Sequence, residues 1–169
     1  VGSLGGFGSS IVWVAIHRAH HRYVDTDKDP HSPMHKGFFN VQFLIMFNKP
    51  SVRYVPDLLR SKFHVFTHQY YYLIHAIYAL ILYTMDPFAV IYAHLVPSFM
   101  IFHAGGFINN FNHMVGWQDH PGKDTSTNNI FTGYLVFGEG WHNNHHAHPM
   151  DWRFGQKWWQ LDISALLKG

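Results

Sequence analysis

The sequence predicts an all-α protein, an integral-membrane helical bundle that carries a histidine-rich site. Two long apolar segments, residues 70–85 and 88–108, are separated only by the turn Asp86-Pro87. The chain contains 16 histidines. Six of them form two trios with the spacing i, i+3, i+4, which puts the side chains of each trio on one face of an α-helix. Helices are therefore expected as the main elements.

Composition sets the limits within which these elements are interpreted. The 169 residues suit one domain, 1–169, and a hydrophobic content of 47% suffices either to bury a core or to face lipid. Only 13% of the residues are charged and the net charge is +2, so neither a nucleic-acid-binding surface nor a disordered tail is indicated. The absence of cysteine excludes disulfides, thiolate metal sites and cysteine nucleophiles. Any metal must therefore bind to nitrogen or oxygen.

The first third of the chain predicts a helix followed by an ordered polar loop. The chain begins at Val1 without a signal-peptide pattern, and we expect it to be a fragment whose N-terminal part is missing. Residues 11–16 are apolar and lead directly into the first histidines, as at the exit of a membrane or buried helix. Residues 22–36 are rich in aspartate and proline, which is typical of turns.

The two apolar segments predict a membrane hairpin at about residues 68–108. A bilayer core needs roughly 20 helical residues, so the second segment is long enough and the first is borderline. Cations precede the hairpin, as expected for a cytoplasmic flank, and a buried hairpin of a soluble protein is the alternative. The tail, residues 152–167, suits a helix at a membrane interface or an ordinary packed helix. The flanking cations are Lys49, Arg53, Arg60 and Lys62.

The histidine trios are the candidates for chemistry. One trio could be a solvated basic patch, but the same spacing twice, on either side of two membrane crossings, favours convergence on one side of the membrane. Asn109 and His113, spaced i, i+4 at the end of the second apolar segment, could complete the site; otherwise they are a polar residue at a helix end and a surface histidine. The trios are His17, His20 and His21, and His142, His145 and His146.

The donor set predicts two metals rather than one. Imidazole binds zinc, copper, iron and nickel, so the ligand type leaves the metal open. A structural zinc needs four ligands and would leave about half of this set unused. A carboxylate-bridged iron pair needs several glutamates, and the chain has one, Glu139. Candidate residues for hydrogen bonds around the ligands, which could equally be turn formers, are Asp25, Asp29, Glu139, Asn143 and Asn144.

The remaining histidines are expected outside the site. Those in loops are expected to be solvated: His31, His35, His120 and His148. Those in or near the hairpin are expected to be packed core or interface groups: His64, His68, His75, His94 and His103. His94 and His103 are also candidates to line an acyl channel, because polar groups inside a membrane are often functional.

Three stretches resemble a known family, the membrane fatty acid desaturases of the Δ9 acyl type. Residues 13–33, with His-Arg-Ala-His-His-Arg-Tyr and Asp-Lys-Asp-Pro-His-Ser-Pro, are similar to the second histidine box of that family. Residues 138–149 are similar to its third box, and Asn109 with His113 is similar to the Asn-x-x-x-His element before it. The resemblance covers most of the chain, and the combination is more specific than any single box.

The resemblance implies a membrane bundle with a di-iron cap facing the cytoplasm or stroma. It implies desaturation of a fatty acyl-CoA or acyl-lipid, with dioxygen as co-substrate and electrons from cytochrome b5 or ferredoxin. In the ligand set that it implies, His17, His21 and His145 bind one iron, and His20, His113, His142 and His146 bind the other, with Asn109 acting through a water. The family's first box, His-x-x-x-x-His, is not in this chain, so we expect it upstream and expect the fragment alone to be inactive.

Two alternative functions stay open at this point. A lipid hydroxylase or ketolase would use the same iron pair, and the histidines cannot distinguish it from a desaturase. A non-catalytic membrane protein that binds metal or lipid, such as a degenerate homologue, would keep the ligands without turnover. The sequence does not determine acyl chain length, double-bond position, acyl carrier or electron donor.

Overall fold

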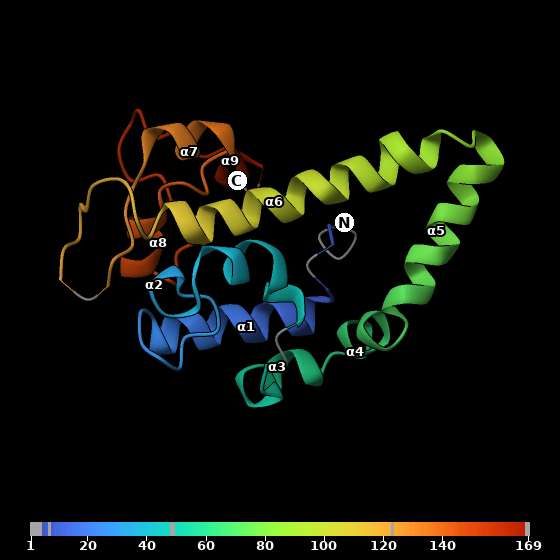
Figure 1. Ribbon diagram of the computed structural model, residues 1–169, viewed down its shortest axis with the longest axis horizontal. Coiled ribbons are helices and arrows are strands. Elements are labelled where there is room, and N and C mark those ends of the chain that lie inside the picture. Colours follow the sequence, from blue (N-terminus) through green and yellow to red (C-terminus); the bar gives the residue numbers. More distant parts are fainter. Residues whose placement is uncertain (1–4, 7, 48–49, 123, 168–169) are drawn as a thin grey trace.

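The computed structural model describes residues 5–6, 8–47, 50–122 and 124–167, and within these ranges the chain is helical without a named strand (Figure 1). Helix α6 runs through the molecule and connects a compact region of short helices and loops to α5 at the opposite end (Figure 1). The elements are α1 Ser10–Tyr23, α2 Pro33–Lys36, η2 Asn40–Leu44, η3 Ile45–Phe47, η4 Val52–Tyr54, α3 Pro56–Leu59, α4 Lys62–Gln69, α5 Tyr71–Met85, η5 Ile91–Leu95, α6 Val96–Phe111, α7 Ile130–Leu135, α8 His142–Ala147 and α9 Ile163–Leu166.

Helix α1 confirms the helix predicted around the first histidine trio. Ser9 caps it, because its hydroxyl accepts a hydrogen bond from the backbone N–H of Val12 at 3.4 Å. Ile11 and Ala15 are buried on one side of the helix and pack with Val55 of the segment between η4 and α3. This small apolar contact holds α1 on the following helices and leaves its other face for the histidines.

The polar stretch after α1 is an ordered loop, as predicted, except that its last four residues form the helical turn α2. Pro33 starts this turn, where its missing N–H costs no hydrogen bond. Segment η2 then packs along α6 at Gly106, where a β-carbon would lie 2.9 Å from the Gln42 side-chain nitrogen. Gln42 is buried there and bonds to the His103 carbonyl oxygen at 3.2 Å. Lys49, one of the predicted flanking cations, lies outside the described residues.

The two long apolar segments form helices on either side of the predicted turn. Helices α5 and α6 diverge from this turn in an open V (Figure 1). The continuous helical stretch Ile91–Phe111 has 21 residues and is long and apolar enough to cross a membrane, whereas α5 has 15 residues and is shorter. No residue of α5 is buried, although the helix is almost entirely apolar. An apolar helix with this exposure needs cover other than water.

Helix α7 has its apolar residues on the outside. Phe131 and Leu135 are exposed, while Thr132 and Gly133 face the interior. Gly133 lies against the ring of Trp141, which is 0% exposed and donates its indole N–H to the Leu161 carbonyl at 2.9 Å. Trp141 is therefore the centre of this region, and the lack of a side chain at Gly133 leaves room for its ring.

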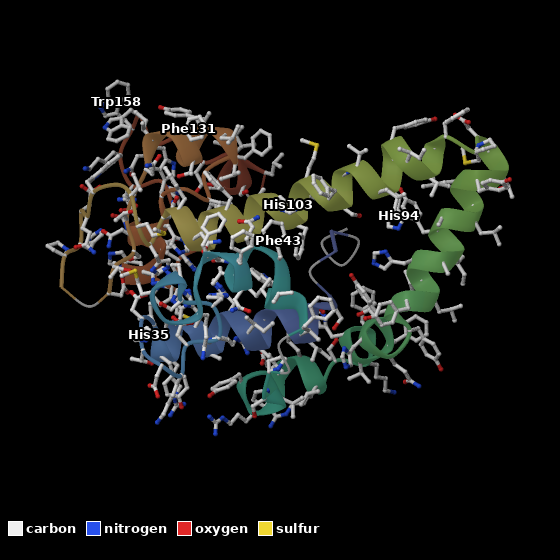
Figure 2. All side chains as sticks on the ribbon, viewed as in Figure 1. His35, Phe43, His94, His103, Phe131 and Trp158 are labelled. Atoms are coloured by element: carbon white, nitrogen blue, oxygen red, sulfur yellow. The ribbon has the colours of Figure 1, made fainter. Side chains whose placement is uncertain are left out.

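The tail is not the single helix predicted for residues 152–167, because only Ile163–Leu166 is helical. Side chains instead bind the backbone before it. The Asp162 carboxylate accepts hydrogen bonds from the N–H groups of Phe154 at 2.7 Å and Gly155 at 3.1 Å. The Gln160 side chain does the same for two further residues. These bonds compete with helix formation, and they leave Trp158 97% exposed at the outer edge (Figure 2).

We predict that Gly140→Ala destabilises this region. A β-carbon at Gly140 would lie 2.1 Å from the backbone nitrogen of Gly133. This nitrogen has no room to move, because Gly133 is held within α7 and lies against the ring of Trp141. The expected loss in the free energy of unfolding is about 1 to 3 kcal/mol, measured by thermal unfolding of the whole protein in detergent. Ala147→Ser, which adds one heavy atom at the exposed end of α8, is the control. Equal melting temperatures for the two variants would contradict the prediction.

Candidate metal centre

Three separate segments bring histidines together beside the buried end of α6. Helix α1 supplies the first trio, and α8 supplies the second. His113 comes from the turn directly after α6, and Asn109 from the last turn of α6 itself. Seven imidazoles and one amide that lie up to 129 positions apart in the chain are thus neighbours. They divide into two groups.

The first group, called here the three-histidine group, consists of His17, His21 and His145. The Nε2 atoms of His17 and His21 are 3.1 Å apart. The Nε2 atom of His145 lies 3.1 Å from that of His17 and 2.9 Å from that of His21. The three nitrogens therefore form a nearly equilateral triangle.

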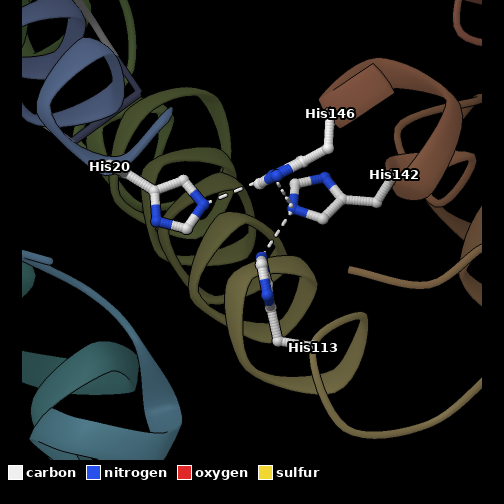
Figure 3. Close-up of side chains that lie close together, drawn as sticks. All are labelled: His20, His113, His142 and His146. Atoms are coloured by element: carbon white, nitrogen blue, oxygen red, sulfur yellow. Dashed lines mark hydrogen bonds between the residues drawn. The ribbon is translucent and has the colours of Figure 1, made fainter. Parts of the chain in front are cut away.

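The second group, called here the four-histidine group, consists of His20, His113, His142 and His146 (Figure 3). The Nε2 atom of His142 lies 3.2 Å from that of His113 and 3.1 Å from that of His146. The Nε2 atom of His20 lies 3.3 Å from that of His146. The two groups adjoin, since the rings of His21 and His146 have centroids 4.5 Å apart.

These distances fit metal ligation. Two nitrogens that each bind a metal at about 2.1 Å with a right angle between the bonds lie about 3.0 Å apart. Three imidazole nitrogens in a triangle cannot all be satisfied by hydrogen bonds among themselves, because a neutral ring has one donor and one acceptor. A cation placed among the Nε2 lone pairs of a group satisfies all of its nitrogens at once. The donor chemistry thus suits two metal ions with all-nitrogen protein ligands.

The protonation states also suit a metal. Burial, together with the charges of neighbouring His21 and His146, lowers the pKa of His145 to about 3. Burial likewise holds the pKa of His142 well below its usual range. Both rings are therefore neutral near pH 7 and have a lone pair available for a metal.

Carboxylates fix the orientation of several imidazoles. Asp29 accepts a hydrogen bond from Nδ1 of His20 at 2.8 Å, and both side chains are fully buried. Asp124 accepts one from Nδ1 of His146 at 3.1 Å. With the proton on Nδ1, the Nε2 lone pair of each ring faces the other histidines. Hydrogen bonds from His146 and Ser126 hold the pKa of Asp124 well below its usual range although burial opposes this.

A network of buried asparagines positions α8. Asn128 donates to the side-chain oxygen of Asn144 at 2.7 Å, and Asn144 donates to the Phe154 carbonyl at 2.8 Å. Asn112, just after α6, donates to the Gly140 carbonyl at 2.9 Å. Because each amide forms bonds to two segments, the network sets α8 in register with α6. Asn143 and Asn144, expected near the ligands, therefore support the backbone rather than the imidazoles.

An apolar cavity of about 640 Å³ opens beside the histidines. Asn109, His142 and His145 lie on its wall. The Nδ2 atom of Asn109 is buried and has no hydrogen-bond partner among the described residues, so a polar group would fit at this point. The apolar wall comes mainly from α6 and from the end of α7, with Pro97, Met100, Ile101, Ala104, Gly105, Ile108, Leu135, Val136 and Phe137.

Comparison with known proteins identifies the family. The family model described as "Fatty acid desaturase" matches residues 1–164. The chain belongs to the fatty acid desaturase family. Among its relatives is the sn-1 stearoyl-lipid 9-desaturase of Synechocystis sp., which is 37% identical over 96% of this chain and 53% of the relative. The resemblance stated from the histidine boxes is thereby confirmed.

Other desaturases are equally similar. The chloroplastic palmitoyl-monogalactosyldiacylglycerol delta-7 desaturase of Arabidopsis thaliana is 36% identical over 93% of this chain and 44% of the relative. The icosanoyl-CoA 5-desaturase of Limnanthes douglasii is 35% identical over 96% of this chain and 48% of the relative. The chain spans about half the length of these relatives. Their names differ in bond position and acyl carrier, so similarity at this level leaves both properties open.

The expectation for one of the loop histidines is wrong. His31 is not a solvated loop residue, since it is 0% exposed and its ring lies 4.0 Å from that of His20. Both of its ring nitrogens are buried without a partner among the described residues, and with His20 and Asp29 it forms a further group close enough to hold a metal ion. His35 and His148 are exposed, and His120 is half-buried. The loop folds back over α1, which local sequence pattern does not reveal.

The hairpin histidines lie apart from the metal groups. His94 is buried and pairs with His75 at 3.2 Å, near the turn between the two long helices (Figure 2). His103 lies beside Gln42, at 3.0 Å. Neither lines the cavity described above, so their proposed role in an acyl channel gains no support from the described residues. Sequence reasoning also missed Asp124 and Thr125, which lie in a polar loop where only their contacts distinguish them.

We predict that the metal-free protein loses stability on acidification. His145 has a folded-state pKa of about 3, against about 6.5 when unfolded, so the unfolded chain binds more protons between these values. Each such group lowers the free energy of unfolding by about 1.4 kcal/mol per pH unit as the pH falls through this window. Burial raises the pKa of Asp29 to about 6. This one group therefore binds more protons in the folded state and opposes the loss of stability.

The measurement is thermal unfolding of the chelator-treated whole protein in detergent between pH 7 and pH 5. The melting temperature is expected to fall with pH, and to fall less in a variant with His142→Gln and His145→Gln. A melting temperature that is constant or rises on acidification would contradict the prediction.

Proposed function

We propose that the whole protein catalyses oxygen-dependent desaturation of a saturated fatty acyl chain at the Δ9 position with a histidine-ligated di-iron centre. The observation that carries the proposal is the placement of two adjoining imidazole groups at the wall of an apolar cavity. Relatives named as 9-desaturases of stearoyl- and palmitoyl-lipids support the substrate class and the position.

The proposed ligands divide between the two groups. His17, His21 and His145 would hold one iron, and the four-histidine group would hold the other. Asn109 would hold a water beside the second iron, which is consistent with its buried amide nitrogen without a partner. An iron pair supplies the reductive activation of dioxygen and the removal of two hydrogens from the acyl chain.

The chain's own residues would orient the substrate and keep water out. The apolar wall from α6 binds an extended acyl chain without offering hydrogen bonds to water. His17 and His145 lie both on this wall and in the three-histidine group, so a chain bound along α6 passes directly beside the ligands. Phe154, stacked on His145 with ring centroids 4.2 Å apart, covers the ligands on the cavity side.

The proposed placement is in a membrane, with the metal centre facing the cytoplasm or stroma. The helical stretch Ile91–Phe111 would cross the bilayer and, with α5, form the membrane hairpin at about residues 68–108. The exposed apolar surface of α5 supports contact with lipid or with other membrane helices. Arg53 and Arg60 precede the hairpin in the sequence. Cations that flank a membrane segment tend to stay on the cytoplasmic side, which is the side proposed for the metal centre.

The proposed partners follow from the reaction. Desaturation reduces dioxygen to water and removes two electrons from the substrate, so two further electrons must come from a donor protein, which we propose to be cytochrome b5 or ferredoxin. The substrate would be a fatty acyl-CoA or an acyl-lipid. We propose that the 169-residue chain alone is inactive, because two ligands of the first iron would come from another part of the protein.

The first prediction of the proposed function concerns metal content. The whole protein is expected to hold about two irons per chain by elemental analysis, and a variant with His142, His145 and His146 changed to alanine is expected to lose them. His148→Ala, an exposed histidine just beyond α8, is the control. About one zinc per chain, insensitive to the triple substitution, would contradict the di-iron centre.

The second prediction concerns the product. When a saturated acyl substrate, dioxygen and an electron donor are supplied, mass spectrometry is expected to show a product two hydrogens lighter, with the double bond at Δ9. A product that gains an oxygen would identify a hydroxylase or ketolase instead. Absence of dioxygen-dependent reductant consumption by the iron-loaded protein would identify a non-catalytic homologue.

The third prediction concerns the cavity. Ala104 lies five residues before Asn109 on α6, about 7.5 Å along the helix, and Ala104→Leu would fill the cavity at that depth. Turnover of long acyl chains is expected to fall about 10- to 200-fold, with a smaller loss for shorter chains whose methyl end stops before this point. Val96→Phe, an exposed position of α6 away from the cavity, is the control. Equal losses for all chain lengths would contradict the prediction.

A further inference from the structure

The two histidine groups differ in what lies behind their imidazoles. A histidine that binds a metal through Nε2 has its Nδ1–H on the opposite side of the ring, and the partner of that N–H affects how strongly the ring donates to the metal. A carboxylate partner carries negative charge and increases the basicity of the ring. A neutral or missing partner does not.

Three of the four rings in the four-histidine group have a carboxylate behind them. Asp29 binds Nδ1 of His20, and Asp124 binds Nδ1 of His146. The third is reached through a hydroxyl, since Nδ1 of His113 lies 3.3 Å from the Thr125 oxygen. The Thr125 hydroxyl donates in turn to Asp25 at 2.8 Å, and the carboxylate itself lies 3.6 Å from the ring.

The three-histidine group has a different surrounding. Nδ1 of His17 and Nδ1 of His145 are both buried without a hydrogen-bond partner among the described residues. Aromatic rings hold these imidazoles instead. His145 stacks on Phe154, and His17 stacks on Trp13 with centroids 5.8 Å apart. Stacking fixes the plane of a ring but supplies no charge to its Nδ1–H.

The carboxylates are built into the fold rather than placed by chance. Asp29 accepts backbone N–H bonds from Asp25 and His31, each at 2.9 Å, so its position is fixed independently of His20. Asp25 also accepts the backbone N–H of Thr125 at 2.7 Å, which ties the loop after α1 to the loop before α7. The negative charge therefore stays beside one group whether or not a metal is bound.

We infer that the two metal sites are unequal, and that Asp29, Asp124 and the Thr125–Asp25 pair are positioning residues that make the four-histidine group the tighter site, even though the iron of the three-histidine group would gain two further ligands from the rest of the protein. The inference rests on the proposed di-metal centre. Metal is expected to leave the three-histidine group first and to enter it last. The three-histidine group, with His17 and His145 on the cavity wall, would then be the exchangeable site.

The test is metal release from the whole protein, loaded anaerobically with Fe²⁺ and mixed with excess bipyridine, whose iron complex is followed by absorbance. The wild type is expected to release one metal per chain in a fast phase and one in a slow phase. Asp124→Asn is expected to speed the slow phase about 10- to 100-fold and to leave the fast phase unchanged. Asp27→Asn, at an exposed aspartate in the loop that holds Asp29, is expected to match the wild type.

A second variant, Asp29→Asn, tests the same phase through His20, and the unchanged fast phase reports that each variant is folded. Release of two metals in a single phase by the wild type would overturn the inference while leaving the di-metal centre intact. Acceleration of the fast phase, or an unchanged slow phase in both variants, would also overturn it. Fewer than two metals per chain in the wild type would overturn the proposed centre itself, and the inference with it.

Discussion

The structure depends on one constraint, which is the burial of seven imidazoles at mutual nitrogen distances of about 3 Å. Neutral rings this close cannot pair all of their nitrogens with one another, and charged rings would repel. Both difficulties disappear when a cation occupies each group. The fold around them serves this arrangement: the apolar contact of α1 with Val55 and the asparagine network behind α8 hold two distant helices face to face. Metal binding to these groups would therefore stabilise the fold.

The exterior reflects a second constraint, which is that the chain has more apolar side chains than it buries. Helix α5 has no buried residue, and α7 has its apolar residues outside and its small residues inside against Trp141. Membership in the fatty acid desaturase family, with the placement in a membrane proposed above, gives this surface a physical explanation, because lipid would replace water around it. The cavity along α6 continues the same apolar character up to the imidazoles.

The two constraints meet at the boundary between the cavity and the metal groups. His17 and His145 belong to both, and aromatic rings rather than carboxylates lie behind them. The carboxylates that bind imidazoles lie around the four-histidine group. The two histidine groups therefore have unequal surroundings.

The sequence by itself determined the local parts of this protein. The spacing i, i+3, i+4 fixed which imidazoles share a helix face, the apolar runs fixed the long helices, and the boxes with their connecting residues identified the family. The histidine spacing did not determine how the histidines divide. The family resemblance implied a division, and the tertiary structure groups His20 with residues of α8 and the turn after α6 although His20 lies on the same helix as His17 and His21. It also decided that His31 is buried, that Asp124 rather than Asn143 supports an imidazole, and that the tail is not one helix. Periodicity along the chain reports the faces of single helices, whereas these features depend on which loop covers which face. That is set by tertiary contacts such as the one between Asp25 and Thr125, 100 positions apart.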